Sequence, residues 1–244
     1  MKQIYIGCSG FSYDHWKGAF YPEGMPKTRW LAYYCTIFSS VELNVTFYRL
    51  PKPETFAKWH AQTPADFNFC IKGSRYITHV KRLKDPAEHL ERFFDAALNL
   101  KEKLKVVLWQ FPPSFAINME RLTEFMQLLS KYDLKNTLEF RNRSWLTEDM
   151  YDLCRQHHVG LCMADWPEYL EELPLTSDFV YIRRHGRSGD YAGCYTNQEL
   201  EKDAVRIRKY LGEGREVFMY FNNDAFGFAP QNAQELLKIL QYLK

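Results

Sequence analysis

Residues 179–222 read FVYIRRHGRSGDYAGCYTNQELEKDAVRIRKYLGEGREVFMYFN and contain a complete strand–helix–strand unit. Strands are predicted at Phe179–His185 and Val217–Asn222, because both are apolar runs of strand length. A helix is predicted between them at Asn197–Leu211, since the threonine before it and the glutamate at its third position form a capping box. Two strands joined in this way run parallel, and the crossover between them is right-handed.

The same alternation of strand and helix continues along the whole chain. The other strands are predicted at Ile4–Gly7, Ser40–Asn44, Phe67–Lys72, Val106–Gln110, Thr137–Arg141 and Leu161–Asp165. The other helices are predicted at Pro53–Gln62, Glu88–Leu100, Met119–Lys131, Thr147–His157 and Pro230–Leu243. Eight parallel strands with helical crossovers imply an α/β fold, a closed (β/α)8 barrel of the TIM type, and 244 residues suit one such domain over residues 1–244.

A doubly wound open sheet is the competing fold. It usually carries a glycine-rich phosphate loop after its first strand. Here Gly7-Cys8-Ser9-Gly10 is followed by Phe11 and does not continue that motif. The closed barrel is therefore favoured.

Composition narrows the class of protein and its partners. The chain has no apolar run of about 18 residues and no apolar leader in MKQIYIGCSG, which predicts a cytoplasmic protein with no membrane partner. A net charge of +2, from 32 Lys and Arg against 30 Asp and Glu, is no general footprint for nucleic acid, so a nucleic-acid partner is possible but not favoured. The six cysteines show no zinc spacing and are interpreted as reduced thiols. The sequence specifies no oligomeric state.

Four predicted strands end in two polar residues at positions i and i+2. The pairs are Glu42 with Asn44, Glu139 with Arg141, Arg183 with His185, and Tyr220 with Asn222. Side chains two apart on a strand point to the same face, so each pair aims two polar groups in one direction. In a barrel they form a ring at the carboxyl ends of the strands, where active sites are built. Lys72, Gln110 and Asp165 join the ring from three further strands.

Seven motifs follow one another in order between Ile4 and Leu240. They read IGCSGFSYDHWKGAFYP, VELNVTFYRLP, FNFCIKGSRYITH, WQFPPSF, LEFRNRSW, YIRRHGRSGDYAGCYT and YFNNDAFGFAPQNA. In these motifs the chain resembles the YecE-like family, domain of unknown function 72. The resemblance implies a TIM-type barrel and no particular reaction. One departure is Phe11, where the family more often has tryptophan.

The candidate catalytic residues are acids and a histidine at strand ends. A buried carboxylate costs several kcal/mol unless it is paired, so it serves either proton transfer or an ion pair that holds the barrel mouth together. Both interpretations stay open for these groups. The predicted catalytic residues are Glu42, Glu139, Asp165 and His185.

The candidate binding residues are cations, amides and loop side chains around the same ring. Arginine offers a planar fork that suits phosphate or carboxylate, and the asparagine and glutamine amides suit hydroxyl groups. His79 and Tyr191 come from long loops that follow strands, whereas Arg184 is expected to face outward. The predicted substrate-binding residues are Asn44, Lys72, His79, Gln110, Arg141, Arg183, Tyr191 and Asn222.

A divalent metal is a weaker expectation. Glu42, His79, Glu139, Asp165 and His185 offer suitable ligands, but no metal-binding spacing joins them, and the nearby arginines oppose a cation. No cofactor and no metal ligand set are therefore predicted.

Four functions remain open. The mixed ring fits best an enzyme that acts on a phosphate- or carboxylate-bearing small molecule or nucleotide by general acid–base chemistry. A metal-dependent nuclease or isomerase of the barrel type would need a bound metal. A glycosidase would need two carboxyl groups about 5–5.5 or 6.5–9.5 Å apart. A non-catalytic module for a nucleotide or nucleic acid would bind with strongly salt-dependent affinity.

Overall fold

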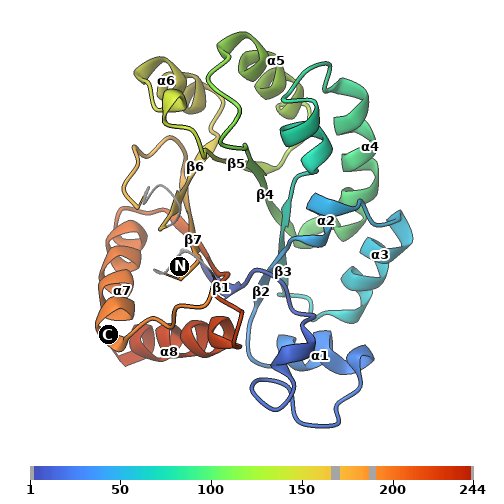
Figure 1. Cartoon of the computed structure of the whole chain (residues 1–244), viewed down its shortest axis with the longest axis vertical. Helices are drawn as coiled ribbons and strands as arrows, with labels where there is room; N and C mark the ends of the chain where they lie inside the picture. The colour runs from blue at the N-terminus through green and yellow to red at the C-terminus, as the bar shows by residue number, and fades with distance from the viewer. Residues whose placement is uncertain (1–2, 166–170, 187–190, 243–244) are drawn as a thin grey trace.

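The computed structural model describes residues 3–165, 171–186 and 191–242, which include eight parallel strands in one sheet. The hydrogen-bonded order is β1-β8-β7-β6-β5-β4-β3-β2, so the first and last strands are neighbours. Figure 1 shows the strands as an inner ring with helices outside, and the chain colour runs around that ring. The strands are β1 Ile4–Cys8, β2 Ser40–Leu43, β3 Asn68–Lys72, β4 Leu104–Gln110, β5 Lys135–Glu139, β6 Gly160–Ala164, β7 Phe179–Arg184 and β8 Glu216–Phe221.

Six long helices confirm the predicted helical segments, and all predicted strands and helices begin and end within three residues of the prediction. They are α3 Pro53–Gln62, α4 Ala87–Ala97, α5 Met119–Leu129, α6 Glu148–Gln156, α7 Asn197–Gly212 and α8 Phe228–Tyr242. Two short helices, α1 Trp30–Cys35 and α2 Val45–Tyr48, were not predicted, because they are aromatic and too short to show helical periodicity. No helix in the described part of the chain is long and apolar enough to cross a membrane.

The core has two parts because every strand alternates between the barrel interior and the helical layer. The outer part joins the strands to the helices and contains most of the buried side chains. The inner part fills the barrel with Tyr5, Cys70, Val106, Leu108, Cys162, Phe179, Tyr181, Phe218 and Tyr220. This plug closes the bottom of the barrel, so the polar side chains at the strand ends lie on a solid floor.

The barrel closes between β1 and β2 without a regular ladder, and we call this junction the seam. One parallel bridge pairs Ser9 with Glu42 at its top. Below it the buried Tyr34 hydroxyl accepts a hydrogen bond from the Cys8 amide at 2.8 Å and donates one to the Ser40 carbonyl at 3.0 Å. Gly7 allows the strands to approach, because a Cβ there would lie 2.1 Å from the Ser40 oxygen. A side chain from α1 thus replaces backbone pairing.

Replacing Tyr34 by phenylalanine is expected to lower the free energy of unfolding by about 1–3 kcal/mol, since it leaves a buried amide and a buried carbonyl without partners. The measurement is urea unfolding followed by circular dichroism. Tyr33→Phe, one position earlier on α1, is the matched control because no hydrogen bond of its hydroxyl joins it to the described residues. Equal losses in both variants would refute the role of Tyr34 in the seam.

Candidate active site at the barrel mouth

Arg183, at the end of β7, lies at the centre of the barrel mouth and is 1% exposed. Its Nη2 lies 3.0 Å from Oε1 of Glu42, and its Nε lies 3.1 Å from Oε2 of the same carboxylate. Its Nη1 donates to Oε2 of Glu139 at 2.8 Å. The guanidinium therefore bridges two buried carboxylates that come from two different strands, β2 and β5.

Glu42 is fully buried and saturated with hydrogen bonds. Besides Arg183, it accepts from the Ser9 hydroxyl at 2.6 Å and from the Tyr181 hydroxyl at 2.7 Å. Both donors are uncharged, so Arg183 supplies the positive charge that makes burial of Glu42 tolerable.

Glu139 contacts two arginine side chains, one at each carboxylate oxygen. Arg141 forms an ion pair with its Oε1, and the Gln110 amide donates to the same atom at 3.1 Å. Burial alone would raise the pKa of Glu139, but Arg141 and Arg183 outweigh it and hold that pKa well below its usual range. Glu139 is therefore a carboxylate at every physiological pH.

His185 is held neutral between an acid and two arginines. Its Nε2 lies 3.1 Å from Nη1 of Arg183, and a guanidinium can only donate, so we assign the ring proton to Nδ1, 3.4 Å from Oδ1 of Asp165. The His185 amide donates to the same oxygen at 2.9 Å, and the Tyr195 hydroxyl donates to the other. Burial, reinforced by Arg183, lowers the pKa of His185 despite its hydrogen bond to Asp165.

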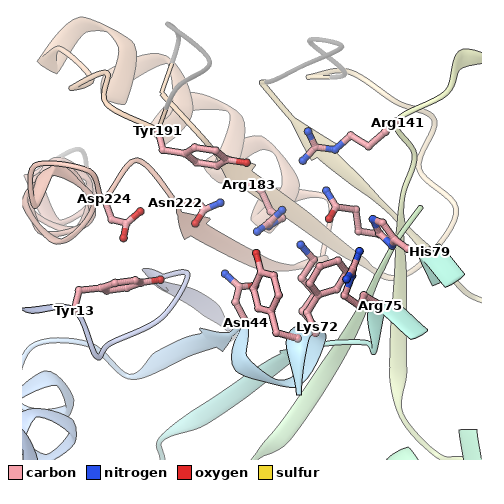
Figure 2. A pocket seen from close by; sticks show the side chains of 13 residues that line it. Tyr13, Asn44, Lys72, Arg75, His79, Arg141, Arg183, Tyr191, Asn222 and Asp224 are labelled. Carbon is pink, nitrogen blue, oxygen red and sulfur yellow. The ribbon is translucent and has the colours of Figure 1, made fainter. Parts of the chain in front are cut away.

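A cavity of about 670 Å³ opens above these ion pairs. Figure 2 shows Lys72, Arg75 and His79 on one side of it, Tyr13 and Asp224 on the opposite side, and Arg183 between them. The first side comes from the end of β3 and the loop after it, and the second side comes from the loops after the neighbouring strands β1 and β8. The lining residues are Tyr13, Asn44, Phe47, Tyr48, Lys72, Arg75, His79, Gln110, Arg141, Arg183, Tyr191, Asn222 and Asp224.

Lys72 ends β3 and is 8% exposed. Its Nζ lies 4.1 Å from the centre of the Phe47 ring, and it makes no hydrogen bond or ion pair with another described residue. Burial is the main cause, and the charge of Arg183 the second, of a lowered pKa of about 7 for Lys72. The residue after Lys72 is Gly73, and its backbone packs directly against Trp109, since a Cβ there would lie 2.1 Å from the Trp109 indole.

Two further groups of the loop after β3 complete the basic side of the cavity. Arg75 is exposed, and its guanidinium makes no hydrogen bond or ion pair with the described residues. His79 lies on a single π-helical turn, Tyr76–Val80, and its Nδ1 is 2.9 Å from the Thr78 hydroxyl. Burial and the neighbouring Lys72 lower the pKa of His79 to about 4, so its ring is neutral at pH 7.

The opposite side of the cavity is rich in oxygen. Asp224 is the one carboxylate among the described lining residues, and burial raises its pKa. The Tyr13 hydroxyl donates to the Ser9 carbonyl at 2.5 Å. Asn44 places a buried side-chain oxygen there that has no hydrogen-bond partner among the described residues. Such a group can accept a hydrogen bond from a ligand.

The structure brings all eight predicted binding residues together on the cavity wall: Asn44, Lys72, His79, Gln110, Arg141, Arg183, Tyr191 and Asn222. The predicted catalytic residues Glu42, Glu139, Asp165 and His185 lie beneath that wall, in contact with its arginines or, for Asp165, through His185. Their assignment to proton transfer stays a prediction. Arg184 points outward as expected and pairs with Asp203 of α7.

Sequence reasoning did not select Arg75 or Asp224. Arg75 follows a strand end by three residues, beyond the reach of the i, i+2 pattern, and Asp224 reads as part of an Asn-Asn-Asp turn. Their positions in two loops after strands were the available signal, because such loops line the mouth of a barrel.

Metal binding has no ligand set in the described residues. No group of three or more histidine, cysteine, aspartate or glutamate side chains is placed there to hold an ion. The acids among the five residues considered from sequence are instead engaged with arginine or histidine side chains, Arg183 for Glu42 and Glu139 and His185 for Asp165.

Comparison with known proteins identifies similar chains over nearly the whole length. Residues 5–244 match the family model described as protein of unknown function DUF72. The protein YunF of Bacillus subtilis is 28% identical, over 97% of this chain and 94% of that protein. YecE of Escherichia coli K12 is 32% identical over 46% of this chain and 39% of that protein. A crystal structure of a DUF72 family protein from Thermotoga maritima has 33% identity and a TM-score of 0.85, covering 98% of this chain and 99% of that one.

Proposed function

Because this chain belongs to the DUF72 family, whose description assigns no activity, we propose a function from the site itself. The protein is an enzyme that binds a small molecule bearing a phosphate or carboxylate at the mouth of the barrel and acts on it by general acid–base chemistry. The anionic group occupies the side of Lys72 and Arg75, and the neutral polar part of the molecule faces Tyr13 and Asp224.

The observation that carries this proposal is the balance of charge around the cavity. Glu42 and Glu139 are matched by Arg183 and Arg141 in contacts of hydrogen-bond length. Lys72 and Arg75 then face the cavity with no carboxylate of the described residues beside them. A cavity with two unmatched basic groups favours an anion, and the protein's near-neutral total charge makes this preference local.

Acid–base chemistry is supported by three lining groups with shifted pKa values. The pKa of Lys72 is about 7, that of His79 is about 4, and that of Asp224 is raised. A catalytic proton donor or acceptor works best when its pKa is near the working pH, which favours Lys72. The buried residues Glu42 and Glu139 are then positioning residues that hold Arg183.

The tyrosines at the rim favour an organic part with a flat face. Tyr48 is 77% exposed and lines the cavity together with Tyr13 and Tyr191. Aromatic rings at the mouth of a basic cavity fit a mononucleotide as well as a smaller ligand. Six free cysteines are consistent with the cytoplasmic location that we also propose.

Binding of inorganic phosphate and of AMP is the direct test, measured by isothermal titration calorimetry. We expect Arg75→Gln to weaken phosphate binding at least tenfold, because it removes one of the two unmatched basic groups, about 1.4 kcal/mol or more. Arg155→Gln, on the outer helix α6, is the matched control and is expected to leave the affinity unchanged.

Binding that is the same in Arg75→Gln and the wild type, or that is absent for phosphate, AMP and small dicarboxylates alike, would contradict the anion site. Tighter binding of AMP than of phosphate would assign the tyrosines to a base or sugar. The glycosidase alternative predicts binding of neutral sugars instead.

A further inference from the structure

Resting on the proposed anion site, we propose that Lys72 is a nucleophile that forms a Schiff base with the carbonyl carbon of a small anionic aldehyde or ketone. This names the substrate class of the cavity more closely than anion binding does.

The amine is held on a rigid support at the cavity surface. Lys72 is the last residue of β3, which pairs with both β2 and β4. The Thr46 hydroxyl, from α2, donates to the Lys72 carbonyl at 2.5 Å, and Gly73 is packed against Trp109. The Phe47 ring lies 4.1 Å from the Lys72 Nζ and restricts the direction of the side chain. A nucleophile needs such fixed placement, since misplacement by about 1 Å can reduce a rate a hundredfold.

No described carboxylate neutralises this amine. The charged groups that act on it are Arg183 from β7, Glu139 from β5, Glu42 from β2 and Arg141, which follows β5. Both carboxylates make their short contacts with guanidinium groups, not with Lys72. The arrangement therefore keeps the amine both desolvated and near a cation, and each of these conditions activates a lysine nucleophile.

At pH 7 this environment leaves a large fraction of the amine uncharged. With a pKa of about 7, about half of Lys72 is neutral, whereas an ordinary lysine with a pKa of about 10.4 is neutral in fewer than one molecule in a thousand. The neighbouring His79 is mostly neutral at the same pH and lies on the same side of the cavity. It therefore adds no charge beside the amine.

The reaction needs no oxidant or cofactor. The nitrogen lone pair of Lys72 attacks the carbonyl carbon, and the C=O π electrons move to oxygen, which takes a proton while nitrogen loses one, giving a carbinolamine. The hydroxyl then takes up one further proton from solvent and leaves as water, while the nitrogen lone pair forms the C=N bond of a protonated Schiff base. Arg75 supplies the partner for the anionic group of the same molecule, which orients its carbonyl toward Lys72.

Trapping with a reducing agent tests the proposal. The full-length protein is incubated at pH 7 with glyoxylate, an aldehyde that carries a carboxylate, and with sodium cyanoborohydride, which delivers hydride to C=N. Peptide mass spectrometry then locates the modified lysines. We expect Lys72 to be modified at least tenfold faster than exposed lysines such as Lys58, in a reaction that saturates with glyoxylate and is slowed by phosphate.

Glycolaldehyde, which has an uncharged hydroxymethyl group in place of the carboxylate, is the matched control and is expected to react more slowly at Lys72. The Lys72→Arg variant should lose the fast site while exposed lysines react as before. Modification of Lys72 at the rate of Lys58 would overturn the proposal.

Anion binding and Schiff-base formation are distinguished by these measurements. If phosphate binds but Lys72 is not trapped, the Schiff base is wrong and the proposed anion site stands. If glyoxylate and glycolaldehyde trap Lys72 equally and phosphate does not bind, the lysine is reactive but the anion site is wrong.

Discussion

Arg183→Met is expected to lower the free energy of unfolding by about 3–5 kcal/mol, because it leaves the buried Glu42 without any cation in contact. Glu139 would keep Arg141, but Glu42 would keep only the uncharged donors Ser9 and Tyr181. The measurement is chemical unfolding at pH 7, or soluble yield and circular dichroism if the variant folds poorly.

A second substitution keeps this prediction decisive. Adding Glu42→Gln to Arg183→Met removes the unpaired charge and is expected to recover at least half of the loss. Arg155→Met breaks an exposed ion pair with Asp152 and is the control, with an expected change below about 1 kcal/mol. If Arg183→Met is no more damaging than Arg155→Met, Arg183 is not the electrostatic centre of the mouth.

Lys72→Met is expected to have the opposite effect and to stabilise the fold by about 2–4 kcal/mol at pH 7, since each unit of pKa shift corresponds to about 1.4 kcal/mol. The pKa of Lys72 falls from 10.5 in the unfolded chain to about 7 in the folded one. At pH 7 folding therefore costs free energy, because it removes the proton from about half of the amine, which is charged in the unfolded chain. Thermal and urea unfolding measure the gain. Lys58→Met on α3, an exposed position, is the control and should change stability by less than about 0.5 kcal/mol.

The pH dependence of this gain follows from the direction of the shift. Between pH 7 and pH 10.5 the unfolded lysine binds more protons than the folded one, so wild-type stability rises with pH. The advantage of Lys72→Met is therefore largest at and below pH 7 and disappears near pH 10.5. A gain that stays constant across this range would contradict the lowered pKa. A residue that costs stability in this way is expected at a site of chemistry.

The placement of the site was predictable from sequence because strand geometry is periodic. Inward parity alone put Glu42, Asn44, Arg183 and His185 at the mouth of the barrel, and alternating strands and helices were enough to imply the closed ring of eight. The depth of each group was not predictable. Glu42 and Asn44 share a face, yet Asn44 lines the cavity and Glu42 is covered.

Pairing between distant strands decides that depth. Arg183 reaches Glu42 across 141 positions and Glu139 across 44, and no local pattern encodes which cation meets which acid. Lys72 and Arg183 looked equivalent in the sequence as cations at strand ends. Only their contacts separate a guanidinium locked into ion pairs from an amine left facing the cavity.

The seam is the place where two neighbouring strands of the barrel, β1 and β2, can separate most easily. Between β1 and β2 the amide protons are protected by one backbone bridge and by the hydroxyl of Tyr34. We therefore expect these amides to exchange with solvent deuterium through local opening, before the other strand pairs separate. The backbone bridge at the top of the seam involves Glu42, and the side chain of the same residue forms an ion pair with Arg183. Opening the seam therefore loosens the ion pair between Glu42 and Arg183 beneath the cavity. A ligand that stabilises this ion pair would also slow deuterium uptake along β1.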